Sequence, residues 1–332
     1  MNINFEPLTQ SKGFCDFLGV PLGADFEYTL LGHGEYNINY LFDKPITGEK
    51  LVLRVPIKSQ MHLENQVRYE YEALRLLEPT GRTPKPLYID DTKAYIPYGF
   101  LVMNYLPGRA LIYEKDLVQG AACLADIHSL SVEQNHLIAP DNALGAMLLE
   151  CQTMVKFYMD STLADANIKK LLEELIVKGS KIVENTRISD DKCLINTELN
   201  SGNFLVNEGA KTYLVDWEKP LFAHFGQDLG HFLAPTTTLW KTDTILKEND
   251  IQNFMKEYAQ ASQHNKTPEE LWAQTLPFFA MNCLRGITWS AMAFIEYSSP
   301  GRLLRDEYTF KKIKYYLTED FLCMLKDDYF GG

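Results

Sequence analysis

The most constraining feature of this 332-residue chain is a change of sequence pattern near residue 110. Before that point, short runs rich in β-branched and aromatic residues alternate with turn residues, which is typical of strands. These runs cover residues 26–32, 38–43, 50–56, 86–90 and 98–106. One helix interrupts them at residues 64–79, where apolar residues recur at helical spacing until Pro79 and Gly81 end it. The first part of the chain is therefore predicted to form a small sheet with one helix.

After residue 110 the pattern is mostly helical. Apolar runs at helical spacing cover residues 114–130, 142–159 and 166–185. A short hairpin closed around Gly209 is the predicted exception, and Thr267 with Glu270 gives the start signal of a further long helix. The sequence thus predicts an α+β fold, with an N-terminal lobe at residues 1–104 and a helical lobe at residues 105–332.

Composition limits the function classes. The chain has 44 acidic and 32 basic residues and a formal net charge of −12, which argues against a nucleic acid or an anionic membrane as the main partner. We see no signal peptide and no apolar run approaching the roughly 20 residues that span a bilayer, so a cytoplasmic protein is expected. The six scattered cysteines lack zinc or redox spacing and are expected to be buried free thiols.

Two features of the N-terminal part are candidates for nucleotide chemistry. Gly32 and Gly34 lie between two predicted strands, where backbone N–H groups could approach phosphate oxygens, although two such glycines also suit an ordinary turn. Arg54 lies mid-strand among apolar neighbours, where a charge is costly without a partner. Its expected partner is Glu70 on the following helix. The pair could hold phosphates or be an ordinary structural ion pair.

A more specific pattern follows in the hairpin region. Glu198 and Asn203 have the acid-x-x-x-x-Asn spacing of a kinase catalytic loop, and Asp216 ends the strand-like run "TYLVDW". A carboxylate and an asparagine oxygen suit Mg²⁺, which takes few protein ligands together with the substrate's own phosphates. These residues indicate phosphoryl transfer, with Asn203 and Asp216 as a suitable ligand set for the metal.

With these motifs, the chain resembles the aminoglycoside phosphotransferase and choline kinase superfamily from residue 30 to residue 233. The resemblance implies the two-lobed protein-kinase-like fold, ATP and Mg²⁺ as cofactors, and a small-molecule acceptor. Each matching segment implies a site residue. In the first part of the chain, the loop implies Asn37, the strand implies Arg54 and the following helix implies Glu70. The hinge "FLVMNYLPG", which would hold adenine, implies Met103 and Tyr105. Further on, the catalytic loop implies Glu198 and Asn203, the metal motif implies Asp216, and "GQDLG" implies Asp228 as the residue that braces the loop.

The catalytic loop departs from the family pattern. Members usually read His-Gly-Asp where this chain has Asn196, Thr197 and Glu198. The glutamate is one methylene longer, and an error of about 1 Å can cost roughly a hundredfold in rate. The loop could shift to compensate, the enzyme could be slow, or the protein could bind nucleotide without transfer. We expect an active or weakly active small-molecule kinase, with a nucleotide-binding pseudokinase or regulatory module as the alternative and an unrelated function on a similar frame as the third hypothesis.

The acceptor is expected to be a cationic amino alcohol or an aminoglycoside. Arg285, Trp289 and Glu296 share one helical face, and Glu218 follows the metal motif. An aromatic and acidic groove would suit a cation. The alternative is a core-facing stripe in which Arg285 and Glu296 pair with each other.

Overall fold

The computed structural model describes residues 3–132, 135–298 and 307–331, in two compact units. The first unit comprises Met1–Arg109, Val132–Leu137 and Phe204–Pro220. The second unit comprises Ala110–Ser131, Ile138–Asn203 and Leu221–Gly332. Residues 204–220 thus cluster with the first unit, whereas the sequence placed them in the C-terminal lobe. The lobe boundary at residue 104 stays a prediction.

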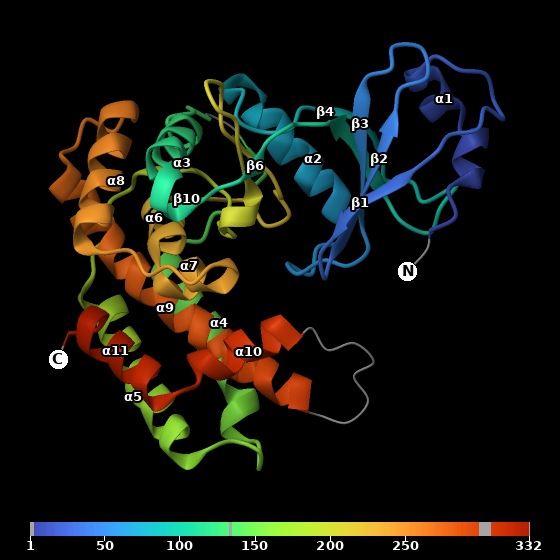
Figure 1. Cartoon of the computed structure of the whole chain (residues 1–332). Coiled ribbons are helices and arrows are strands. Elements are labelled where there is room, and N and C mark those ends of the chain that lie inside the picture. The colour runs from blue at the N-terminus through green and yellow to red at the C-terminus, as the bar shows by residue number, and fades with distance from the viewer. Residues whose placement is uncertain (1–2, 133–134, 299–306, 332) are drawn as a thin grey trace. The chain divides into compact units, whose positions relative to one another are not determined.

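The first unit contains a five-stranded antiparallel sheet with the strand order β1-β2-β3-β5-β4 (Figure 1). Its strands are β1 (Thr29–His33), β2 (Asn37–Asp43), β3 (Lys50–Pro56), β4 (Pro86–Asp90) and β5 (Phe100–Asn104). Each overlaps one of the five predicted runs, so the predicted strands are confirmed. A 3₁₀ helix (Glu6–Gln10) and α1 (Lys12–Leu18) precede the sheet.

The central strand β3 is buried along most of its length, as expected of a strand covered on both faces. Leu51, Leu53 and Val55 pack in the apolar core that also contains Phe14 of α1. Because successive side chains of a strand point to opposite faces, Arg54 points away from that core. It reaches Glu70 on α2 (Gln66–Leu77).

Helix α2 occupies the predicted position. The Asn65 side chain caps its N-terminus by accepting a hydrogen bond from the Arg68 N–H at 3.1 Å. A 3₁₀ turn (Glu78–Thr80) follows, and Gly81 with φ of +61° ends the segment, as a left-handed residue commonly does after a helix.

The predicted hairpin is confirmed, with strands shorter than the runs suggested. Its strands are β8 (Phe204–Val206) and β9 (Tyr213–Leu214), and Gly209 takes a φ of +73° in the connecting turn. The hairpin is tied to the rest of the first unit where the Leu214 N–H donates to the Arg82 carbonyl at 2.8 Å. This tie fixes the segment from which Asp216 and Glu218 project.

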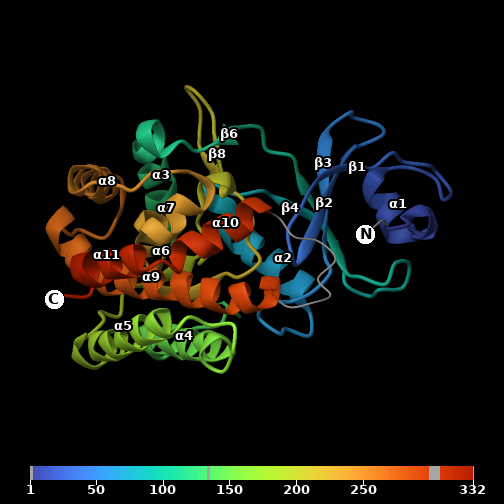
Figure 2. The ribbon, with the colours of Figure 1, turned by 60° about the horizontal axis from the view of Figure 1, so that its bottom comes forward.

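The second unit is mainly helical. Its helices are α3 (Tyr113–His128), α4 (Ala143–Met159), α5 (Ala166–Asn185), α6 (Gly226–Leu233), α7 (Pro235–Lys241), α8 (Glu248–Ala261), α9 (Pro268–Ser298), α10 (Glu307–Tyr316) and α11 (Glu319–Tyr329). A 3₁₀ turn (Ser201–Asn203) and the antiparallel pair of β7 (Lys192–Ile195) and β10 (Leu221–His224) complete it, while β6 (Arg109–Ala110) lies where the first unit ends. Helices α4 and α5 lie side by side against α9 (Figure 2).

Helix α9 begins as the sequence predicts. Glu270 N–H donates to Thr267 Oγ1 at 3.2 Å, and Thr267 N–H donates to Glu270 Oε2 at 2.8 Å, which is the reciprocal capping box. The expectation that no apolar run is long enough to span a bilayer is wrong for this helix, because α9 is long and apolar enough to do so by length and composition alone. However, 67% of its most apolar stretch is buried inside the protein, so core packing accounts for its composition.

The prediction of buried free thiols is confirmed for five of the six cysteines. All six are free, five are buried, and Cys323 is half-buried.

Candidate active site

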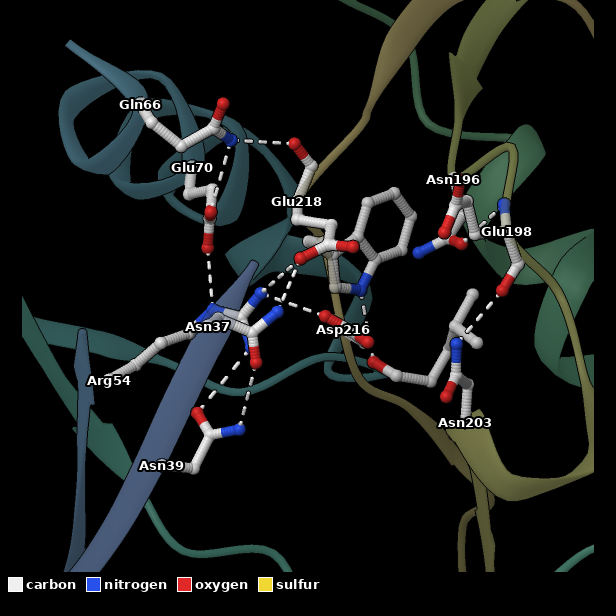
Figure 3. Close-up of polar contacts among 12 residues, drawn as sticks. Asn37, Asn39, Arg54, Gln66, Glu70, Asn196, Glu198, Asn203, Asp216 and Glu218 are labelled. Atoms are coloured by element: carbon white, nitrogen blue, oxygen red, sulfur yellow. Dashed lines mark hydrogen bonds and ion pairs between the residues drawn. The ribbon is translucent and has the colours of Figure 1, made fainter. Parts of the chain in front are cut away.

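Arg54 is the centre of a buried charge cluster in the first unit (Figure 3). Its side chain is only 4% exposed, and its Nε lies 2.6 Å from Glu70 Oε2. Burial opposes the charge of Arg54, but Glu70, Asp216 and Glu218 together raise its pKa. Burial raises the pKa of Glu70. The charge of Arg54 and the hydrogen bonds from Arg54 and Gln66 offset only part of that rise. The guanidinium is therefore a fixed, permanently charged cation.

Two carboxylates beyond β9 reach the same guanidinium. Arg54 Nη2 lies 2.8 Å from Asp216 Oδ1 and 3.5 Å from Glu218 Oε2. The Asp216 side chain is 35% exposed, whereas that of Glu218 is 11% exposed. Asp216 also has a φ of +64°, a conformation that costs a non-glycine residue energy and is often found at functional sites. Asp216 is thus the member of the cluster most open to a ligand.

Two amide side chains tie Glu218 into the cluster. The Gln66 amide donates to Glu70 Oε1 at 3.1 Å and to the Glu218 carbonyl at 2.7 Å. Asn37, at the start of β2, donates to Glu218 Oε2. We define the Arg54 cluster as Asn37, Arg54, Gln66, Glu70, Asp216 and Glu218. It holds three carboxylates against one guanidinium, and this excess of negative charge favours a cation.

Gly32 and Gly34 lie just before Asn37 of this cluster in the sequence. Gly32 pairs with Asn39 in the β1–β2 ladder, and the Gly34 N–H donates to the Asn37 carbonyl at 2.9 Å. Neither glycine has a positive φ, so backbone conformation does not explain them. A Cβ added at Gly32 would meet no atom within 4 Å. Gly32 therefore borders open space, as a residue that lets a ligand approach the backbone would.

Met103 and Tyr105, the predicted hinge residues, lie at and just after the end of β5. Met103 faces Val52 in the ladder, and the Tyr105 N–H donates to the Lys50 carbonyl at 3.1 Å. Both side chains are half-buried. The backbone N–H of Tyr105 is therefore already used within the sheet.

The predicted catalytic loop lies in the second unit and is held by Asp228. The Asp228 carboxylate accepts hydrogen bonds from the N–H groups of Asn196 and Thr197, both at 2.7 Å. Thr197 has a φ of +71°. The loop thus keeps an unfavourable backbone conformation because two short charge-assisted hydrogen bonds fix it. This is the contact expected of a bracing residue.

A chain of buried side chains supports Asp228 from behind. His128 Nε2 lies 3.3 Å from Asp228 Oδ2, and its Nδ1 lies 3.0 Å from the Tyr258 hydroxyl. Tyr258 is fully buried in α8. Sequence reasoning missed Tyr258, because His128 lies 130 residues away along the chain and no motif links the two residues.

Glu198 is fixed through its backbone and paired through its carboxylate. Its N–H donates to Asn196 Oδ1 at 3.0 Å, and its carbonyl accepts a hydrogen bond from Asn203 Nδ2 at 2.8 Å (Figure 3). The carboxylate Oε1 lies 3.4 Å from Arg285 Nη2. Arg285 Nε lies 3.2 Å from Glu150 Oε2.

The alternative pairing of Arg285 with Glu296 is wrong. Eleven residues of helix span about 16 Å along the axis, which is too far for an ion pair. The structure pairs Arg285 with Glu150 and Glu198 instead. Glu296 is exposed near the end of α9, and Trp289 packs edge-to-face on Trp240 with ring centres 5.2 Å apart.

The described residues contain no group of three or more His, Cys, Asp or Glu side chains arranged to hold a metal ion by themselves. Of the two predicted ligands, Asp216 belongs to the first unit and Asn203 to the second. The assignment of Asn203 and Asp216 as metal ligands stays a prediction.

Comparison with solved structures identifies the fold. A Ralstonia eutropha protein assigned to the aminoglycoside phosphotransferases aligns with a TM-score of 0.71 at 13% identity, over 98% of this chain and 99% of its own. A choline kinase from Cryptosporidium parvum has a TM-score of 0.63 at 14% identity, over 92% and 91% of the two chains. A spectinomycin phosphotransferase in complex with ADP and spectinomycin has a TM-score of 0.63 at 15% identity, over 92% of each chain. The predicted kinase-like α+β fold is confirmed.

The sequence itself identifies the family. No curated protein sequence matches the chain significantly. The family model described as the phosphotransferase enzyme family, however, matches residues 27–277, well over half of the chain. The chain therefore belongs to the phosphotransferase enzyme family.

Proposed function

We propose that the protein transfers the terminal phosphoryl group of ATP to a hydroxyl group of a small molecule, with the help of Mg²⁺. The family makes the protein a phosphotransferase, and the donor, metal and acceptor are the proposal. One observation carries it: the buried Arg54–Glu70 pair fixes a cation in place while Asp216, on the same guanidinium, remains 35% exposed.

The proposed nucleotide site uses the first unit. Arg54, fixed by Glu70 at 2.6 Å, would bind phosphate oxygens without the entropy cost of ordering a surface side chain. Gly32 and Gly34, with Asn37, would lie against the phosphates, and the open space at Gly32 supports this role. Met103 and Tyr105 would hold the adenine. The ADP in the spectinomycin phosphotransferase supports a nucleotide as the donor.

The oxygen donors fit Mg²⁺. Asp216 offers a partly exposed carboxylate within an anionic cluster, and the Asn203 amide uses its nitrogen on the Glu198 carbonyl, which leaves its oxygen as a donor atom. Hard oxygen ligands of this kind, together with phosphate oxygens, are what Mg²⁺ takes in phosphotransferases. When bound, the metal would neutralise charge on the phosphates.

Glu198 is the proposed acid/base residue. It would accept the proton of the acceptor hydroxyl as the new oxygen–phosphorus bond forms and ADP leaves. The acceptor would be a cationic amino alcohol or an aminoglycoside, bound with the help of Glu218, Trp289 and Glu296. In the structure, Glu218 is bonded to Asn37 and Arg54, Trp289 packs on Trp240, and Glu296 is exposed.

The second candidate is a nucleotide-binding protein without transfer activity. It was suggested by Asn196 and Glu198, and the comparisons give it no support. Under this alternative, nucleotide binding would survive Glu198→Gln and no acceptor would yield a product.

Thermal unfolding with ATP or GTP, with and without Mg²⁺, tests the nucleotide site. A ligand at a hundred times its Kd stabilises the folded protein by about 2.7 kcal/mol, which gives a shift of several degrees. We expect a Mg²⁺-dependent shift that Asp216→Asn abolishes. Asp190→Asn, at a side chain that is 95% exposed, serves as the matched control and should keep the shift. No shift with any nucleotide contradicts the proposal.

A further inference from the structure

We infer that Arg285 is the positioning residue that holds the Glu198 carboxylate in place, and that it compensates for the extra methylene of this glutamate. The inference rests on the proposed function, in which Glu198 is the acid/base residue. Neither the family match nor the catalytic-loop pattern assigns a role to Arg285, which lies 87 residues beyond Glu198 in the sequence.

The backbone around Glu198 cannot shift to accommodate a longer side chain. Asp228 fixes the two preceding N–H groups at 2.7 Å each. The Glu198 N–H and carbonyl are themselves bonded to Asn196 and Asn203. The only freedom left to the carboxylate is rotation about the side-chain bonds, so a partner is needed to select one conformation.

Arg285 is that partner. Among the residues that the structure describes, its Nη2 is the one group recorded within bonding distance of the Glu198 carboxylate, at 3.4 Å. The Arg285 side chain is 15% exposed and projects from the middle of α9, where Leu284 and Thr288 are buried. A charged group in such surroundings adopts few conformations.

The guanidinium is anchored at two further points. Its Nη1 donates to the Thr197 carbonyl at 3.3 Å, and its Nε lies 3.2 Å from Glu150 Oε2 on α4. Because Arg presents its donors in a rigid planar fork, these two contacts fix the direction of the third. Arg285 thus contacts both the backbone of the catalytic loop and the Glu198 carboxylate, and it would hold the carboxylate at a fixed position relative to that backbone.

The consequence is specific to glutamate. An aspartate on the same fixed backbone would place its carboxylate about 1 Å further from a guanidinium that is already at 3.4 Å, beyond hydrogen-bonding distance. Arg285 should therefore matter to catalysis when residue 198 is glutamate and matter little when it is aspartate. A purely structural arginine would matter equally in both cases.

A kinetic double-mutant cycle tests this, with turnover of the wild-type protein measured first. We expect Arg285→Gln to lower kcat by about 10- to 100-fold, the effect of a roughly 1 Å misplacement, with the KM for ATP unchanged. In the Glu198→Asp background, the same change should lower kcat by less than about threefold. Equal factors in the two backgrounds, or no loss in the wild-type background, would overturn the inference.

Two controls keep the result interpretable. Arg285→Gln leaves Glu150 without its counter-charge, so the cycle is repeated with Glu150→Gln, where the Arg285 effect should persist. If Arg285→Gln does not fold, Arg285→Lys enters the same cycle, with an expected loss of about 3- to 10-fold in the Glu198 background alone. Absence of wild-type turnover with every acceptor would refute the proposed function and this inference together, whereas turnover with equal factors would refute only the inference.

Discussion

Replacing Arg54 with methionine should destabilise the protein strongly and in a pH-dependent way. Methionine has a similar length but no charge, so the change leaves Glu70, Asp216 and Glu218 without their shared cation. Removing one partner of a buried ion pair costs about 3–5 kcal/mol. Because three carboxylates lose their counter-charge here and two of them are 11% exposed or less, we expect a loss near the upper end, about 4–5 kcal/mol at pH 7.

The sign of the pH dependence follows from the same contacts. Burial already raises the pKa of Glu70, and Arg54 is the main group that lowers it again. Without Arg54, the folded protein would take up a proton at a higher pH than the unfolded chain does. Folding would then be favoured by acidification, so the stability difference between Arg54→Met and wild type should shrink from pH 7 to pH 5.

Urea unfolding followed by circular dichroism, without nucleotide, measures both effects. The matched control is Arg54→Met combined with Glu70→Leu, because replacing both partners of a buried pair with apolar groups costs less than removing one. We expect the double variant to recover about half of the loss. The reasoning is refuted if Arg54→Met lies within 1 kcal/mol of wild type at pH 7, or if its deficit does not shrink at pH 5.

Four further predictions concern other parts of the chain. Gly230→Ala should lower the free energy of unfolding by about 1–3 kcal/mol, because its Cβ would lie 2.6 Å from Phe279 N. Gly32→Ala should leave the free energy of unfolding in urea unchanged but weaken nucleotide binding. If Gly32→Ala destabilised the protein as much as Gly230→Ala does, the result would contradict the open space at Gly32. Asp228→Asn should cost about 2–4 kcal/mol and most of the turnover, because one amide oxygen cannot replace two carboxylate oxygens; a stable, active variant would exclude the bracing role. Burial lowers the pKa of His224 and of His264 to about 4, so between pH 6.5 and 4 the unfolded chain binds protons that the folded protein does not. The urea midpoint should therefore fall with pH in that window, and it should fall less in His224→Asn.

The sequence predicts the five strands of the sheet, the hairpin and helices α2 to α5 and α9, because each of these carries a local pattern. The strand β3 is rich in Leu and Val around Arg54, the hairpin has a glycine at the one turn position with a positive φ, and α9 begins at a capping box. The partnership of Arg54 and Glu70 was also predictable, since a charge in a buried strand requires a partner and the next helix offered one.

Contacts between distant segments were not predictable in this way. Gln66 binds the Glu218 carbonyl across 152 residues, and Glu150 binds Arg285 across 135. No periodicity or motif links such residues, because their proximity results from tertiary packing. The assignment of residues 204–220 to the first unit has the same origin. The sequence shows the catalytic-loop glutamate as a departure from the family pattern with several possible outcomes, and the structure adds its arginine partner.

The central claim is phosphoryl transfer, and its most direct test is product formation by the wild-type protein and by Glu198→Gln. Each protein is incubated with ATP, Mg²⁺ and a panel of amino alcohols, aminoglycosides and neutral sugars, and phosphorylated products are detected by mass spectrometry. The account predicts a phosphorylated product of a cationic acceptor with the wild-type protein, and a loss of about a hundredfold or more in Glu198→Gln. Nucleotide binding without product from any acceptor, or turnover unchanged by Glu198→Gln, would contradict it.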